Sequence, residues 1–140
     1  MAGLRYVKSL IGHNTAALER FIVTNGETIT KGDLVRLTDG YATICTGGTS
    51  VLGVANETVV GNGVKTVEVN VDPYAVYEIT ADNVGTTTAQ AHMGTYHDVT
   101  GTTGAVLLDS STTGATGELL ALKLDGTKVM VALAEKQTNL

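Results

Sequence analysis

The three histidines, His13, His92 and His97, are the first residues to consider as metal ligands. His92 and His97 are separated by four residues that include Gly94. A glycine would interrupt a helix here, and in a strand this spacing places the two rings on opposite faces. Only Asp98 adds a carboxylate nearby. We therefore expect the histidines on the surface or in loops, and we predict no metal site.

Hydroxyl and thiol nucleophiles lack the partners that covalent catalysis needs. The serines, none of which lies in a nucleophile-elbow sequence, are Ser9, Ser50, Ser110 and Ser111. Cys45 is the single cysteine, which excludes an intramolecular disulfide. It lies in the strand-like run 42–46, where a thiol usually acts as a small buried hydrophobe. The sequence therefore predicts no catalytic nucleophile.

Carboxylates and glycines give no stronger sign of an enzyme. Asp72 and Glu78 could come close together in a sheet, but acids on alternating strand positions usually form a solvated face. The run 61–66, Gly-Asn-Gly-Val-Lys-Thr, is glycine-rich but lacks the Walker spacing and leads into a strand. We interpret it as a hairpin turn. We therefore predict no catalytic residues, no cofactor and no enzyme activity.

Composition limits the partners of the chain. It has 140 residues, enough for one domain, and a net charge of -5 without a basic stripe, which argues against nucleic acid. No signal peptide or membrane-spanning stretch is evident, so we expect no membrane partner. Aromatic residues make up only 4% of the chain. A core of small side chains buries little apolar area, so we expect oligomerisation.

Alternation of apolar and polar residues predicts an all-β fold. The clearest strand is Val67–Asp72, which Pro73 ends. Two hairpins are predicted, one turning at Asp39-Gly40 and one at Asp125-Gly126. Helical turns at 16–19 and 81–84 are weak alternatives, and the first could instead continue as a strand into 21–23. Many short strands joined by tight turns favour a small antiparallel β-barrel or sandwich.

The chain divides into an N-terminal arm, residues 1–16, and one β-domain, residues 17–140. The arm combines apolar residues with Arg5 and Lys8 and has no acidic residue. It could be a frayed terminus or an extended tail that becomes ordered on a partner. Residues 86–116 are rich in Thr, Gly and Ser, which predicts large exposed loops.

The run 29–37, followed by 39–42 and 51–55, resembles the capsid decoration, or cement, proteins of tailed phages. Similar features follow in order at 67–72, 81–85, 106–109 and the hairpin through Val131, so the resemblance covers residues 20–133. It implies a β-tulip or SH3-like barrel on the outer surface of a virion capsid. It also implies a homotrimer that is made in the host cytoplasm, binds the major capsid protein of its phage and stabilises the shell.

Within that resemblance, the N-terminal arm is the predicted capsid-binding element. Arg5 and Lys8 would meet acidic groups of the capsid, and the other members would add apolar contacts. The predicted binding residues are Leu4, Arg5, Tyr6, Val7, Lys8, Leu10 and Ile11.

Two other functions stay open. The first is another phage structural role, as a head-fibre or tail protein built from the same kind of strands. The second is a carbohydrate-binding β module, which could also use the loops in 86–116 to bind host glycans. Its stacking residues would be Tyr6, Tyr41, Tyr74, Tyr77 and Tyr96. The absence of Trp weakens this second alternative.

Overall fold

The computed structural model describes residues 3–10, 17–45, 50–82, 90–110, 117–134 and 136–137. These residues form an all-β fold of antiparallel sheets with one short 3-10 helix, η1 (Gln90–His92). The strands are β1 (Arg5–Ser9), β2 (Leu18–Ile22), β3 (Thr28–Ile29), β4 (Leu34–Thr38), β5 (Tyr41–Ile44), β6 (Gly53–Ala55), β7 (Val59–Val60), β8 (Thr66–Asn70), β9 (Ala75–Thr80), β10 (Tyr96–His97), β11 (Val99–Thr100), β12 (Leu107–Leu108), β13 (Leu119–Asp125) and β14 (Lys128–Leu133). The predicted all-β class is thus confirmed.

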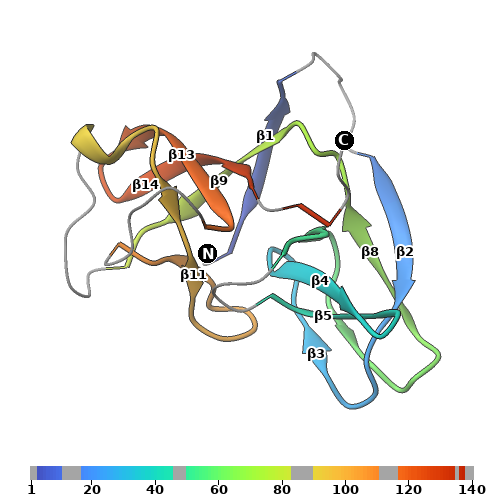
Figure 1. The fold of residues 1–140 in the computed structure, drawn as a ribbon. Helices are drawn as coiled ribbons and strands as arrows, with labels where there is room; N and C mark the ends of the chain where they lie inside the picture. Colours follow the sequence, from blue (N-terminus) through green and yellow to red (C-terminus); the bar gives the residue numbers. More distant parts are fainter. Residues whose placement is uncertain are drawn as a thin grey trace.

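Two open five-stranded sheets form the body of the protein (Figure 1). The first has the order β1-β9-β14-β13-β10 and the second the order β2-β8-β6-β4-β5. Two-stranded ribbons, β3-β7 and β11-β12, complete the described strands. Neither five-stranded sheet closes on itself, so the architecture is not a closed barrel.

The centre of the second sheet, at β4 and β6, is buried on both faces. Leu34 and Val54 pack with the first sheet in one core, whereas their neighbours Val35 and Ala55 belong to a second, smaller core. A strand covered on both sides needs apolar residues at consecutive positions. This explains why the apolar pairs in β4 and β6 do not alternate with polar residues.

Both predicted hairpins are confirmed. β4 pairs with β5 around Asp39-Gly40. β13 pairs with β14, but Asp125 still pairs with Lys128, so this turn consists of Gly126 and Thr127, one position later than predicted. Asp39 has a φ of 52° and Gly40 a φ of 86°, a left-handed geometry that Asp-Gly sequences favour. The predicted hairpin at 61–66 is wrong, because β7 pairs with β3 whereas β8 pairs with β2 and β6. Asn62 instead closes a local turn by accepting hydrogen bonds from the backbone of Val64 and Lys65.

Three more local predictions can be compared with the structure. Residues 18–22 form the strand β2, which confirms the strand alternative to a helical turn at 16–19. Cys45 is buried, as expected of a small hydrophobe. The strand predicted at 67–72 is β8, and within this run Asn70 and Asp72 are buried whereas Glu68 is half-buried. Positions 83 and 84 of the second weak helical turn lie outside the described residues.

Asp33 connects the turn before β4, in the second sheet, with the loop between β11 and β12. Its buried carboxylate accepts hydrogen bonds from the Thr30 backbone N–H at 2.8 Å, the Thr103 hydroxyl at 2.6 Å and the Gly104 backbone N–H at 2.9 Å. The first bond closes the turn before β4, and the other two hold the β11-β12 loop. A single side chain thus fixes the second sheet to a segment about seventy residues later.

The described parts of both chain ends lie against the sheets. β1 is an edge strand paired with β9, from Arg5↔Glu78 to Ser9↔Ala75, with a bulge between Tyr6 and Lys8. At the other end, the Gln137 side chain accepts the Leu37 N–H at 2.7 Å and donates to the Leu37 carbonyl at 3.0 Å. Residues 3–10 of the predicted arm therefore extend along the domain.

Candidate binding site beside the N-terminal strand

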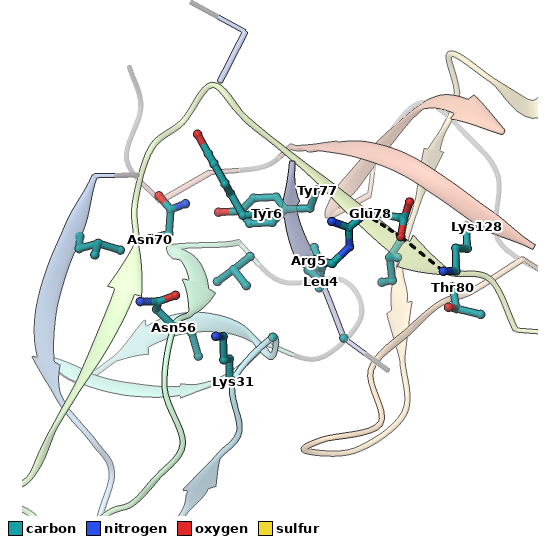
Figure 2. A pocket seen from close by; sticks show the side chains of 16 residues that line it. Leu4, Arg5, Tyr6, Lys31, Asn56, Asn70, Tyr77, Glu78, Thr80 and Lys128 are labelled. Carbon is teal, nitrogen blue, oxygen red and sulfur yellow. Dashed lines mark ion pairs between the residues drawn. The ribbon is translucent and has the colours of Figure 1, made fainter. Parts of the chain in front are cut away.

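A pocket of about 530 Å³ lies between the start of β1 and the second sheet. Its walls come from β1, β2, β6, β8 and β9, the start of β14 and the turn at 31–32. Figure 2 shows Asn56 and Asn70 across the pocket from Arg5, Glu78 and Lys128. Segments far apart in the sequence thus meet at one site, which the pairing of β1 with β9 creates.

Charged residues at the pocket are mainly basic. Arg5 and Lys128 flank Glu78, with nitrogen-to-oxygen distances of 3.1 Å and 3.7 Å. Lys31 adds a third cation and has no ion-pair partner in the described part of the chain. The hydrogen bond from Arg5 lowers the pKa of Glu78, which keeps this carboxylate charged. Three positive charges therefore face one negative charge, although the whole chain is acidic.

Apolar side chains form much of the interior of the pocket. Leu4, Val54 and Ile79 are buried members of the larger core, and they also line the pocket. Leu18 of β2 lines it too but keeps 42% of its surface exposed. The site therefore has an apolar interior with charged side chains around it, a common composition of ligand and peptide pockets.

Tyr6 and Tyr77, which line the pocket, belong to a group of polar residues that extends to Asp72. The rings of Tyr6 and Tyr77 meet edge to face, with centroids 5.9 Å apart. Their hydroxyls, together with Asp72 Oδ2, are buried without a hydrogen bond of normal geometry among the described residues. Burial raises the pKa of the Tyr77 hydroxyl, and the Asp72 charge raises it further, while a contact with Asn70 acts in the opposite direction.

This buried tyrosine predicts a specific alkaline behaviour. Unfolded chains release the tyrosine proton above pH of about 10, whereas the folded protein retains it on Tyr77. The stability that protonated Tyr77 contributes is therefore complete below pH of about 10. At higher pH the free energy of unfolding falls by about 1.4 kcal/mol per pH unit. In Tyr77→Phe this loss is absent. Urea unfolding of both proteins between pH 9 and 11.5, read by circular dichroism, should show the variant gaining relative stability by about 1 kcal/mol or more. A difference that stays constant with pH would contradict this.

The predicted binding residues have different positions. Leu4 is buried in the core, Arg5 is exposed and paired with Glu78, and Tyr6 is half-buried against Tyr77. These three border the pocket. Val7, Lys8 and Leu10 are exposed and lie away from it, and Ile11 falls outside the described residues. The structure thus brings three of the predicted residues together at one site.

The histidines differ from expectation. His97, predicted on the surface, is fully buried, because the neighbouring strands cover it. Its ring lies 6.5 Å from that of His92, centroid to centroid, in spite of the spacing that predicted opposite faces. The bend at 93–95 between η1 and β10 brings them together. His13 falls outside the described residues, and the described ranges hold no cluster of three or more His, Cys, Asp or Glu arranged for a metal.

The tyrosines considered for sugar stacking do not share one accessible surface. Tyr77 is buried, and Tyr6 and Tyr96 are half-buried. Tyr41 and Tyr74 are exposed, but the Lys136 ammonium lies 5.7 Å from the centroid of the Tyr74 ring. Of the predicted loop region, the described part, 90–110, contains β10, β11 and β12, with Val106 and Leu108 buried.

Sequence reasoning missed Lys31, Glu78 and Lys128 as members of a binding site. Lys31 was visible only as part of a turn before β4, and Lys128 only as the residue after a hairpin turn. No local spacing connects positions so far apart. Only the register of β1 with β9 and of β9 with β14 brings Arg5, Glu78 and Lys128 into contact.

No helix in the described ranges has the length and apolar character needed to cross a lipid bilayer. Comparison with models of known protein families gives no match, and no curated protein is significantly similar to this chain.

Proposed function

We propose that this chain is a structural protein of a tailed-phage particle that binds the outer surface of the assembled capsid and stabilises it. The observation that carries the proposal is the pocket beside β1. Residues chosen from the sequence as capsid-binding, Arg5 and Tyr6 among them, border a basic and partly apolar site. The resemblance of residues 20–133 to capsid decoration proteins supports the identity of the partner, the major capsid protein.

A shell-binding role also suits the way β1 is held. Pairing with β9 fixes the strand, so its exposed side chains are presented without the entropy cost of ordering a free tail. Val7, Lys8 and Leu10 lie exposed along or just after this strand. Association into a trimer, the state that the resemblance implies, would let a weak single contact act on many identical sites through avidity.

The test is co-sedimentation of the purified protein with expanded, decoration-free capsids of its phage. Unexpanded procapsids serve as the control shell, and mass measurement of the free protein gives its oligomeric state. Saturable binding to expanded shells is the expected result. Failure to bind any shell would contradict the proposal and favour a tail or head-fibre role.

Single substitutions are better probes than deletion of the N-terminus. Leu4 is part of the core, so its removal would destabilise the domain together with any binding surface. Charge reversal of Lys8, Lys8→Glu, leaves the core unchanged. We expect it to weaken shell binding about tenfold at low salt, whereas Lys123→Glu, the same change on the exposed part of β13, should have little effect.

A further inference from the structure

We infer that the pocket beside β1 binds an acidic, extended segment of the partner protein, with an apolar side chain inserted between β1 and the second sheet. The inference rests on the proposed function in one respect: the shell protein is taken as the source of the segment. The acidic and apolar character of the segment is inferred from the pocket alone.

Charge complementarity indicates an acidic occupant. Arg5, Lys31 and Lys128 surround the pocket, and Glu78 offsets only part of their charge. They come from three separate elements, β1, the turn before β4 and β14. Arg5 and Lys128 already share Glu78, whereas Lys31 has no ion pair in the described residues, so an extended segment with carboxylates along its length can contact Lys31 and the other two cations together.

The interior indicates that the segment also carries an apolar side chain. Leu18 lines the pocket with 42% of its surface exposed, next to the buried side chains of Val54 and Ile79. Covering this surface removes apolar area from water. A volume of about 530 Å³ falls in the usual range of pockets that enclose ligands. Apolar anchors inside and charged contacts around them are the usual anatomy of a peptide site.

Nucleic acid fits the same cations less well. A phosphate backbone would meet a chain with a net charge of -5, which disfavours its approach. Tyr77 is buried and Tyr6 is half-buried with its ring packed edge to face against Tyr77, so neither is the fully exposed aromatic ring on which single strands stack. The acidic net charge and the packed tyrosines therefore favour a protein segment as the occupant.

The direct test uses a fluorescein-labelled heptapeptide in which Glu alternates with Val or Leu, its ends blocked. Fluorescence anisotropy with the whole chain at low salt should show saturable binding with a dissociation constant below about 1 mM. Amide NMR shifts should concentrate at residues that line the pocket. A peptide with Lys in place of Glu and an eight-nucleotide oligothymidylate serve as comparison probes, and both should bind at least about tenfold more weakly. Absence of acidic-peptide binding, or tighter binding of either comparison probe, would overturn the inference.

Matched variants locate the binding. Lys31→Glu is expected to weaken the acidic peptide about tenfold, whereas Lys123→Glu, with the same change in net charge, should act less than about twofold. Leu18→Ala should also weaken binding several-fold, while Leu122→Ala, at an equally exposed leucine outside the pocket, should not. Equal effects of a variant and its control would place the peptide elsewhere.

These results are distinguishable from those of the shell experiment. Binding to expanded capsids without binding to the acidic peptide would leave the proposed function standing and remove the inference. Peptide binding without shell binding would remove the capsid as the source of the segment and leave an acidic-peptide site.

Discussion

Asp33→Ala is expected to lower the free energy of unfolding by about 3 kcal/mol, measured by urea unfolding followed by circular dichroism. The substitution removes the acceptor of three hydrogen bonds, from the Thr30 and Gly104 backbones and the Thr103 hydroxyl. Because Asp33 is fully buried, water does not replace these bonds without a rearrangement of both loops. The effect should exceed that of most surface substitutions by several-fold.

The Asp33→Asn variant tests whether the negative charge and both oxygens of Asp33 are needed for stability. Asp33→Asn has the same shape but only one accepting oxygen, and its amide group would face donors, so a loss of at least about 2 kcal/mol is expected. The matched control is Asp39→Asn, at an exposed position whose φ of 52° asparagine tolerates. A loss below about 1 kcal/mol for both Asp33 variants would show that Asp33 does not hold the two parts together.

Gly53→Ala should be at least as damaging, with a loss of about 3 kcal/mol or more, or failure to fold. A Cβ atom at Gly53 would lie 2.1 Å from the Asn70 carbonyl oxygen and 2.9 Å from Val69 Cγ1. Since the closest atom belongs to the backbone of β8, no side-chain rotation relieves the overlap. β6 and β8 would have to separate, which would also disturb the pocket wall that Asn70 helps to form.

The control for Gly53 is Gly94→Ala. Gly94 has a φ of 88°, so alanine there is strained, but no atom lies within 4 Å of its added Cβ. We expect a loss of about 1 kcal/mol from the backbone alone. Thermal unfolding of the two variants side by side measures the difference. If Gly53→Ala unfolds at the same temperature as Gly94→Ala, that result would contradict the 2.1 Å approach of an added Cβ to the β8 backbone.

Much of the fold follows from local sequence signals. Asp39, Gly40 and Gly126 are turn residues with positive φ values, which few residue types adopt, so both hairpins can be predicted without tertiary information. The Gly61-Asn62-Gly63 turn looks equally typical of a hairpin, but the strands on either side pair elsewhere. The residues of a turn show where the chain changes direction. Which strands then pair depends on all the other strands of the fold.

The pocket could be predicted only in part. The basic and apolar character of the N-terminal segment pointed to Arg5 and Tyr6, because that information is local. The roles of Lys31 and Lys128 depend on contacts across the whole chain. The burial of Asn70 and Asp72 likewise depends on a distant strand, because both interact with Tyr77 of β9.

The order of strands in the first sheet has a consequence for how this protein is made. β9 and β14 are neighbours at its centre, and β1 pairs with β9 alone. A chain growing on the ribosome therefore cannot complete this sheet until residues 128–133 have emerged, and the Gln137 contact with Leu37 forms later still. Folds dominated by such distant pairings form slowly. The buried apolar side chains of β9 stay uncovered until then, so low temperature or a slow rate of expression should favour a high yield of folded protein.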